Sequence, residues 1–207
     1  MDKNIIISLL LWSIFGYQHS LLARPKFKNY IKSILGTTFE KHCYPLIYFI
    51  SQCIIFLIIY DLIRQLDPGS VIIRVDTEYE IVIYTLNRFA NIFLILTIFH
   101  FDVGRFTGVT QFLGYFKKER SKDANYVEEL NTNYLYRYIR HPMYLGIIFV
   151  YATSTTIYSE IFFVNLVSII FYIEIGSYFE EKTLIAKYGL IYKEYSKGTY
   201  KYLPFIR

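Results

Sequence analysis

The stretch from Tyr136 to Gly146 holds the most concentrated set of groups in the chain that could do chemistry. Arg140 and His141 stand directly before Pro142, which suits the first turn of a helix because its missing N–H costs nothing there. Both side chains would then lie at a helix N-terminus, where free backbone N–H groups and the helix dipole also favour an anion. This predicts a site for a carboxylate or phosphate. The same residues could instead form a basic anchor beside the membrane that only fixes orientation.

The other reactive residues do not form a metal or hydrolase motif. The chain has four histidines, and no two are spaced like the paired ligands of an H-E-x-x-H helix: they are His19, His42, His100 and His141. No G-x-S-x-G or G-x-G-x-x-G sequence is present for a serine hydrolase or a dinucleotide fold. The two cysteines fall at or inside one apolar run, which indicates small buried side chains. We therefore predict no metal site.

Long apolar blocks indicate that an integral-membrane protein positions these groups. Apolar residues make up 54% of the 207 residues and aromatic residues 20%, and a block of about 20 apolar residues can cross a bilayer. We predict one all-α domain, residues 1–207, folded as a bundle of five transmembrane helices. The predicted spans are residues 5–22, 43–63, 81–101, 142–158 and 161–179. Only Ser159 and Glu160 separate the last two spans, which indicates a tight helical hairpin.

Basic residues gather in alternate loops of this predicted bundle. Segments 23–42, 102–141 and 180–207 are rich in Lys and Arg, whereas segment 64–80, with the turn sequence Asp67-Pro68-Gly69, holds more acidic residues. The positive-inside rule places the three basic segments in the cytoplasm, with the N-terminus outside and the C-terminus inside. The net charge of +5 therefore indicates topology rather than binding to nucleic acid.

This topology brings polar residues from four helix ends to the cytoplasmic face. They are Gln18-His19-Ser20, His100-Phe101-Asp102, Arg140-His141 and Glu180-Glu181. Each group alone could be a helix-end or anchoring group, but four such ends at one membrane depth favour a functional site. We predict an active site at the cytoplasmic face of a multi-pass membrane protein.

Two motifs give the C-terminal half a family resemblance. The first, Arg140-His141-Pro142-x-Tyr144-x-Gly146, resembles the R-H-P-x-Y-x-G motif of the isoprenylcysteine carboxyl methyltransferase and phospholipid methyltransferase superfamily. The second resembles the Glu-Glu pair of that superfamily with its spaced G-x-x-Y-x-x-Y, and reads Glu180-Glu181-Lys182-Thr183-Leu184, then Gly189, Tyr192 and Tyr195. The match covers roughly residues 97–204. It implies an integral-membrane enzyme that uses S-adenosyl-L-methionine as methyl donor.

The N-terminal half extends the resemblance to one branch of this superfamily, the membrane-bound methanethiol S-methyltransferases and their NnrU-like relatives. The opening of that branch is similar to Gly16-x-Gln18-His19-Ser20-x-x-Ala23-Arg24-Pro25-x-Phe27-Lys28. His100-Phe101-Asp102 and the run Tyr136-Arg137-Tyr138 also match. Residues 103–108 depart from the pattern of the branch.

The resemblance implies that residues of about 134–204 bind the methyl donor. Arg140, His141 and the helix N-terminus can hold its carboxylate. Glu180 or Glu181 can accept hydrogen bonds from its ribose or its amine.

Three further residues complete the predicted donor site. Tyr144 can wall the purine or donate a hydrogen bond, and Gly146 would allow close helix packing. Tyr192 lies on an amphipathic tail that, by the resemblance, closes the cofactor pocket; the tyrosines of this tail could instead form an interfacial belt. Glu174, inside the last span, could line the same cavity or pair with a neighbouring helix.

The branch implies S-methylation of a small thiol such as methanethiol to a thioether. The thiolate is the reactive form, and His19, His100 or Arg140 near the sulfur would favour it or take its proton. The predicted partners are this lipid-soluble small molecule and the bilayer. Alternative acceptors are a prenylcysteine carboxylate or a phospholipid amine. The alternative of another class is a non-catalytic membrane transport or accessory protein.

Overall fold

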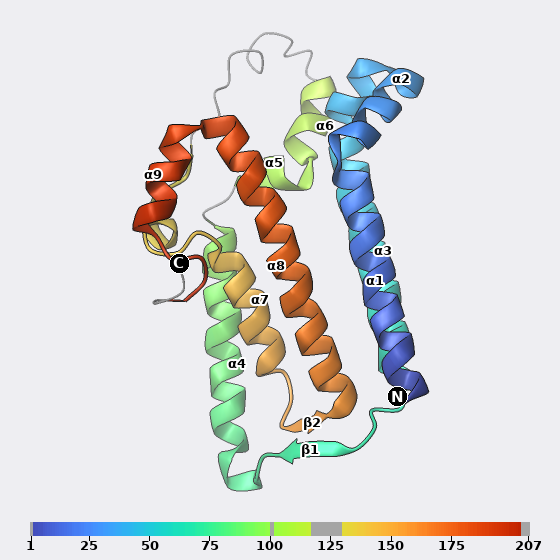
Figure 1. Cartoon of the computed structure of the whole chain (residues 1–207), viewed down its shortest axis with the longest axis vertical. Helices are drawn as coiled ribbons and strands as arrows, with labels where there is room; N and C mark the ends of the chain where they lie inside the picture. Colours follow the sequence, from blue (N-terminus) through green and yellow to red (C-terminus); the bar gives the residue numbers. More distant parts are fainter. Residues whose placement is uncertain (1, 100–101, 117–129, 204–207) are drawn as a thin grey trace. The chain divides into compact units, whose positions relative to one another are not determined.

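The computed structural model describes residues 2–99, 102–116 and 130–203 (Figure 1). Its elements, in chain order, are α1 (Lys3–Ala23), α2 (Pro25–His42), α3 (Tyr44–Arg64), β1 (Val71–Arg74), α4 (Thr77–Ile98), α5 (Val103–Thr107), α6 (Val109–Phe116), the 3-10 turn η2 (Tyr134–Arg137), α7 (Pro142–Ala152), β2 (Ile157–Ser159), α8 (Glu160–Tyr188) and α9 (Leu190–Gly198). They form two compact units. One holds β1, α4, η2, α7, β2, α8 and α9, and the other holds α1 from Ile6 onward with α2, α3, α5 and α6.

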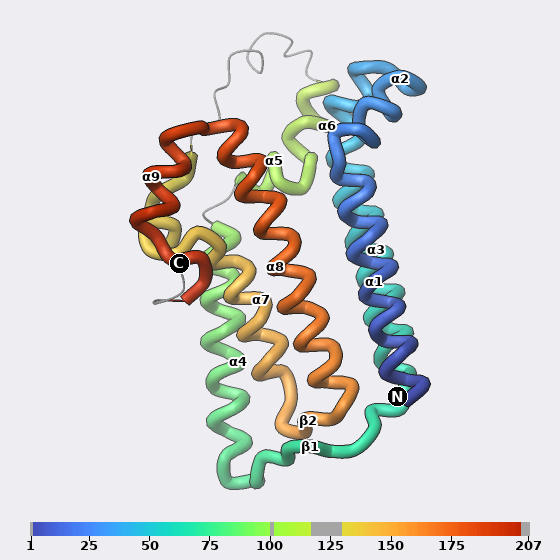
Figure 2. The backbone as a smooth tube through the Cα atoms, in the orientation of Figure 1, coloured from blue at the N-terminus to red at the C-terminus, as the bar shows by residue number. Residues whose placement is uncertain are grey.

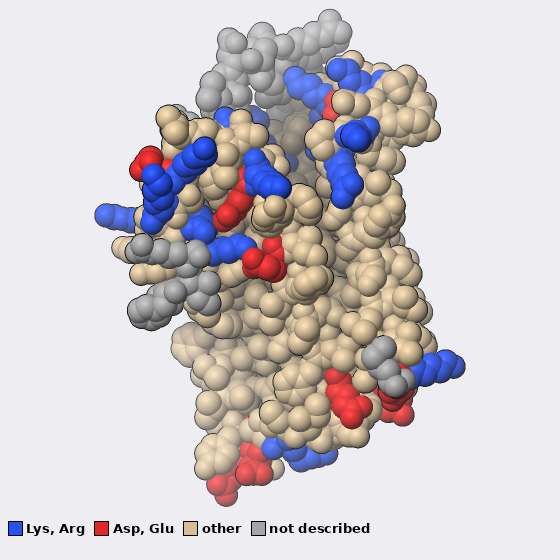
Figure 3. Space-filling model, viewed as in Figure 1, with Lys and Arg blue, Asp and Glu red and all other residues tan. Residues whose placement is uncertain are grey.

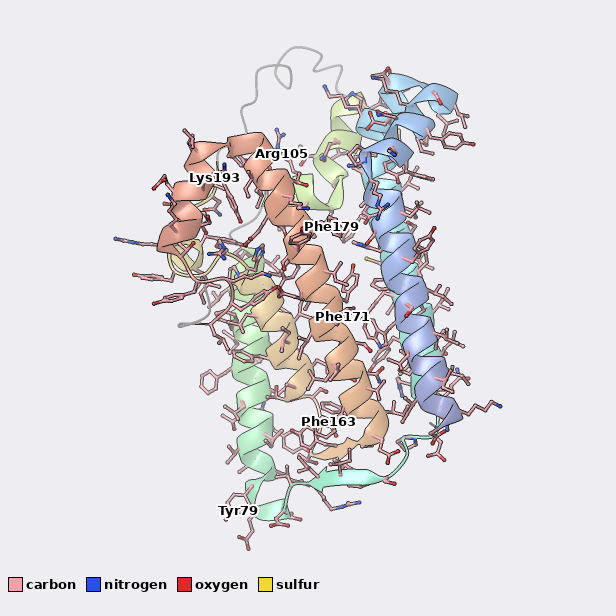
Figure 4. The ribbon with its side chains drawn as sticks, viewed as in Figure 1. Tyr79, Arg105, Phe163, Phe171, Phe179 and Lys193 are labelled. Atoms are coloured by element: carbon pink, nitrogen blue, oxygen red, sulfur yellow. The ribbon has the colours of Figure 1, made fainter. Side chains whose placement is uncertain are left out.

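Four of these helices are long and apolar enough to cross a membrane: α1, α3, α4 and α8. Their large apolar side chains are mostly exposed in the isolated chain, as lipid-facing surfaces require. On α8, for example, Phe171 and Phe179 are 67% and 50% exposed and are spaced along the helix (Figure 4). The prediction of several long apolar helices that could cross a membrane is therefore confirmed for these four segments.

The predicted span 142–158 is not one helix. Its helix, α7, ends at Ala152 after 11 residues and rises about 16 Å, roughly half the thickness of a bilayer core. The next residues, Thr153-Ser154-Thr155-Thr156, are polar or β-branched and favour extended structure over helix. The predicted helix end is therefore wrong, and so is the two-residue hairpin, because residues 153–159 separate α7 from α8.

The chain is mostly helical, as predicted, but it also has a small antiparallel sheet that was not predicted. Strand β1 pairs with β2, with Val71 opposite Ser159 and Ile73 opposite Tyr158. The run Val71-Ile72-Ile73 consists of β-branched residues that favour a strand. The pairing joins segments far apart in the sequence, which hydropathy alone does not reveal.

The predicted turn at Asp67-Pro68-Gly69 is confirmed and helps to start α8. Gly69 N donates to Asp67 Oδ1 over 3.0 Å, and Gly69 has a φ of +73° that favours glycine. Pro68 O accepts from Ile161 N over 3.2 Å, while the N-cap Ser159 Oγ accepts from Phe162 N over 3.3 Å. Two of the otherwise unpaired N–H groups of the first turn of α8 are satisfied in this way.

Helix α7 packs closely on α4 at Gly146. A Cβ atom at this position would lie 3.1 Å from Leu94 Cδ1 and 3.2 Å from Leu94 Cα. About one turn further along α7, Asn87 Nδ2 of α4 donates to Val150 O over 3.0 Å, and it also donates to Thr153 Oγ1, just past the end of α7, over 3.1 Å. The prediction that Gly146 permits close helix packing is confirmed, and this packing fixes where α7 begins.

In the second unit, α1 runs beside α3 (Figure 2). Gln18 and Gln52 join the two helices through paired amides, with Nε2 of Gln18 2.8 Å from Oε1 of Gln52. Tyr44 OH also donates to Leu22 O over 2.7 Å. The spans predicted for residues 5–22 and 43–63 therefore match α1 and α3 to within two residues at each end.

Candidate active site

Arg140 and His141 lie where η2 leads into α7, and the C-terminal segment, residues 199–203, runs beside them. Ile139 forms a parallel bridge with Tyr200. Arg140 N donates to Tyr200 O over 2.8 Å, and His141 N donates to Lys201 O over 3.1 Å. These two N–H groups, which stand just before α7, are therefore paired with the C-terminal segment, and binding of an anion at this helix end stays a prediction.

The side chain of Arg140 joins three elements. Its Nε donates to Glu181 Oε1 on α8 over 2.8 Å. Its Nη1 donates to the carbonyl oxygens of Ser196 and Thr199, at the end of α9, over 2.8 and 2.6 Å. Only 7% of the Arg140 side chain is exposed. A guanidinium suits this place because it neutralises a carboxylate and the last carbonyls of a helix at once.

His141 is the N-cap residue of α7 and faces both glutamates of α8. Its Nε2 lies 3.1 Å from Glu181 Oε1, a contact that requires a proton on Nε2 because an ionised carboxylate only accepts. Its Nδ1 lies 3.7 Å from Glu180 Oε2. The ring stacks on Tyr144, with centroids 5.3 Å apart. The imidazole is thus held between two carboxylates and an aromatic face.

Tyr144 completes the network on the second glutamate, since its OH donates to Glu180 Oε2 over 2.8 Å. The side chain of Glu180 remains 42% exposed, compared with 23% for Glu181. Both glutamates therefore contact the first motif, but Glu180 keeps more of its surface open to a ligand. The structure brings together five of the predicted site residues: Arg140, His141, Tyr144, Glu180 and Glu181.

The glutamates can reach α7 because α8 is longer than the predicted span. The helix continues past residue 179 to Tyr188 and is followed by Gly189, whose φ is +59°. Consecutive residues on a helix point about 100° apart, so Glu180 meets Tyr144 and Glu181 meets Arg140, while both lie near His141.

Tyr192 is buried in α9 rather than placed in an interfacial belt. It is 1% exposed, and its OH has no hydrogen-bond partner among the described residues. Burial raises the pKa of Tyr192, as does the nearby charge of Glu181. Burial also raises the pKa of Tyr195, to about 12, and its OH donates to Tyr136 O over 2.6 Å. Both phenols therefore keep their protons at neutral pH, and of the two only that of Tyr192 has no partner among the described residues.

The two predicted catalytic histidines are not part of this network as described. His19 belongs to the second unit, where its ring lies 5.8 Å from that of Phe15 and 5.6 Å from that of Tyr48. His100 lies outside the described residues. Their catalytic roles stay predictions.

Sequence reasoning missed the C-terminal segment and its contacts with α8. Lys201 pairs with Glu174, Tyr202 OH lies 2.7 Å from Ser177 Oγ, and the ring of Tyr202 lies 5.9 Å from that of His141. Glu174 therefore pairs with the C-terminal segment and not with a neighbouring helix, the pairing predicted for it. A polar Ser177 and a Glu174 close together in an apolar span were the available signal.

Comparison with known proteins identifies the family. Methanethiol S-methyltransferase 1 of Bradyrhizobium diazoefficiens is 30% identical over 99% of this chain and 68% of its own length. The chain belongs to the methanethiol S-methyltransferase family. Methanethiol S-methyltransferases of Pseudomonas deceptionensis and Crocosphaera subtropica are each 27% identical over 98% of this chain, and over 74% and 75% of their own lengths.

This membership confirms the resemblance of the sequence to the methanethiol S-methyltransferase branch, and with it an enzyme that transfers methyl groups. No family model matches the chain, and no solved structure is significantly similar to it.

Proposed function

We propose that the chain transfers the methyl group of S-adenosyl-L-methionine to the sulfur of methanethiol, giving dimethyl sulfide. The C–S bond to the donor methyl breaks, a C–S bond to the acceptor forms, and the thiol proton is released. The observation that supports this function best is the network of Arg140, His141, Tyr144, Glu180 and Glu181, in a chain whose relatives are named for this reaction.

The residues present fit the donor, which carries a carboxylate, an amine, a ribose and an adenine. The carboxylate of Glu180 is partly exposed and can accept from the ribose or the amine. The buried OH of Tyr192 has no partner among the described residues, and such a group is costly unless a ligand accepts from it. When bound, S-adenosyl-L-methionine supplies a methyl group already activated on a sulfonium.

Arg140 has a narrower role in this proposal than the sequence implies. Its Nε and Nη1 are bonded to Glu181 and to the end of α9, so we assign Nη2 to the donor carboxylate. His141 and Tyr144, stacked on each other, form an aromatic wall. The close packing at Gly146 supports this wall in our proposal, because it fixes the position of α7.

The acceptor side rests on the chemistry of thiols. A thiol is mostly protonated at neutral pH, and its thiolate is the nucleophile. We assign removal of the proton to His100 or His19, each a group able to take it, and keep Arg140 for the carboxylate of the donor. Exclusion of water and alignment of the two sulfur atoms with the methyl carbon then accelerate the methyl transfer.

We further propose that the chain crosses the membrane five times, with the N-terminus outside and the active site at the cytoplasmic face. Helix α7 rises about 16 Å and residues 153–159 can extend up to about 23 Å, so together they can traverse a core of about 30 Å. The last two spans then form a hairpin with an extended connection. Basic side chains gather over α9 and the adjoining end of α8 (Figure 3), as expected for a cytoplasmic end.

The test is an acceptor panel with protein purified in detergent. Donor labelled in its methyl group is supplied with methanethiol, with a prenylcysteine or with phosphatidylethanolamine, and label is measured in the headspace and in the lipid extract. We expect labelled dimethyl sulfide from methanethiol only. Label in the prenylcysteine or in the phospholipid would show that this compound, and not methanethiol, is the acceptor. Label in none of the three products would favour the transport or accessory alternative.

A further inference from the structure

The C-terminal segment contacts the first motif through backbone and side chain together. Its carbonyl oxygens at Tyr200 and Lys201 accept from the N–H groups of Arg140 and His141, and Tyr200 N donates in turn to Tyr138 O over 2.9 Å. Thr199 O accepts from the Arg140 guanidinium. Four hydrogen bonds therefore tie this segment to residues 138–141, and any shift of the segment moves both motif side chains.

An ion pair fixes the segment to α8 well inside the helix. Glu174 lies 14 residues from the start of α8, which is about 21 Å along its axis. Placing an ionisable residue within a membrane span costs free energy, and such a residue is usually paired with another charged or polar group. Here the partner is Lys201, whose side chain is 15% exposed, whereas that of Glu174 is 56% exposed. The lysine is thus the buried member, and it lies next to His141 along the bridge.

A second contact to α8 follows directly. Ser177 is fully buried, and its Oγ donates to Glu174 O over 3.0 Å. Tyr202 OH lies 2.7 Å from Ser177 Oγ, a hydrogen bond in which either hydroxyl can be the donor. The ring of Tyr202 then lies 5.9 Å from that of His141, on which Tyr144 also stacks. Tyr202 therefore limits where the imidazole can lie.

We propose that Lys201 and Tyr202, held on α8 by Glu174 and Ser177, are positioning residues for the methyl donor. They act through His141, whose N–H donates to Lys201 O and whose ring lies beside that of Tyr202, and through Arg140, whose N–H donates to the adjoining Tyr200 O. This inference rests on the proposed function. Its consequence is specific: release of the segment weakens binding of the donor, because Arg140 loses Thr199 O and His141 loses an aromatic neighbour, while capture of the thiol is unaffected.

The test compares three variants of the ion pair in the full-length protein in detergent. Glu174→Gln and Lys201→Met each break the pair, and the double exchange of Glu174→Lys with Lys201→Glu restores it in reverse. Binding of S-adenosylhomocysteine is measured by calorimetry, and KM values are measured for the donor and for methanethiol. Lys197→Met is the matched control, because it breaks an exposed pair with Glu194 on α9.

We expect each single variant to raise the Kd for S-adenosylhomocysteine and the KM for the donor about tenfold, the size of effect given by one lost interaction of moderate strength. The exchange should recover most of this loss. The KM for methanethiol should stay within about twofold of the wild-type value, which is the variation expected when two sites are not coupled. Lys197→Met should leave both constants unchanged. Recovery by the exchange is the result that a general loss of stability does not produce.

Unchanged binding in both single variants would overturn the inference, as would a loss that the exchange fails to recover in protein that remains folded by thermal melting. Where the ion-pair variants do not fold, Tyr202→Phe removes one hydrogen bond and Ser177→Ala removes two, without changing charge, and both variants must raise the same Kd for the inference to stand. Wild-type protein that does not bind S-adenosylhomocysteine would instead refute the proposed function itself.

Discussion

Arg140 and Glu181 are 41 residues apart in the sequence, yet Nε of the first lies 2.8 Å from Oε1 of the second. This bond joins the two sequence motifs, since one stands at the start of α7 and the other near the end of α8. Because the Arg140 side chain is only 7% exposed, the pair is shielded from solvent and its two members depend on each other.

Replacing Glu181 should therefore destabilise the fold as well as the site. In Glu181→Ala the guanidinium of Arg140 stays buried without its carboxylate, and we expect a loss of about 3 kcal/mol in the free energy of unfolding. Chemical denaturation in detergent measures this. Glu194→Ala, which breaks an exposed pair with Lys197, should lose less than about 1 kcal/mol. Equal losses in the two variants would contradict the importance given to the Arg140–Glu181 bond.

Tyr192→Phe should separate binding from stability. Its OH has no partner among the described residues, so removing it should leave the melting temperature unchanged or raise it. Affinity for S-adenosylhomocysteine should fall about tenfold, as expected for one lost hydrogen bond of about 1.4 kcal/mol. Calorimetry and a thermal melt of the same sample measure the two effects.

Tyr195→Phe is the matched control for this experiment. Its OH donates to Tyr136 O, so its loss should lower the free energy of unfolding by about 1 kcal/mol. If Tyr192→Phe instead destabilised the protein and bound S-adenosylhomocysteine like the wild type, its OH would not face the donor.

Gly146→Ala should loosen the contact of α7 with α4. Its Cβ would meet the backbone and side chain of Leu94 at 3.1–3.2 Å, and overpacking of this kind costs about 1–3 kcal/mol. In Gly176→Ala, on α8, the new Cβ meets nothing within 4 Å, so this variant should be as stable as the wild type or up to about 1 kcal/mol more stable. Melting temperatures in detergent show whether each variant is more or less stable than the wild type. A Gly146→Ala variant that is more stable would refute the close packing.

Much of this arrangement is predictable from the sequence. The four long apolar blocks predict α1, α3, α4 and α8, because burial in lipid demands continuous apolar helices. The residue types of the two motifs predict which side chains meet, since a guanidinium and an imidazole near two carboxylates pair by charge.

The remaining features depend on contacts that residue types do not encode. The end of α7 at Ala152 is set partly by the pairing of β1 with β2, which joins distant segments. The N–H groups of Arg140 and His141 are satisfied by backbone carbonyls of the C-terminal segment, and every residue has such a carbonyl. Likewise, the partner of Glu174 is Lys201, 27 residues later, one of several lysines in the tail.

The proposed topology predicts which loops are accessible from outside. In a background of Cys43→Ser and Cys53→Ser, single substitutions Glu78→Cys and Lys197→Cys place thiols at the two ends of the proposed bundle. A membrane-impermeant maleimide applied to intact cells should label the first and not the second, which should react only after lysis. The reverse pattern would show that the orientation is opposite to the one proposed. Labelling of both positions in intact cells would contradict an odd number of spans between residues 78 and 197.

The central claim is that the network around Arg140 is the methyl-donor site, and the most direct test is binding of S-adenosylhomocysteine to wild-type protein and to Arg140→Ala. The account predicts saturable one-to-one binding to the wild type, and in the variant a loss of affinity of about 100-fold or more, because a buried charge-assisted contact is removed. Binding of equal strength to a folded Arg140→Ala protein would place the donor elsewhere. No binding to the wild type would contradict the donor itself.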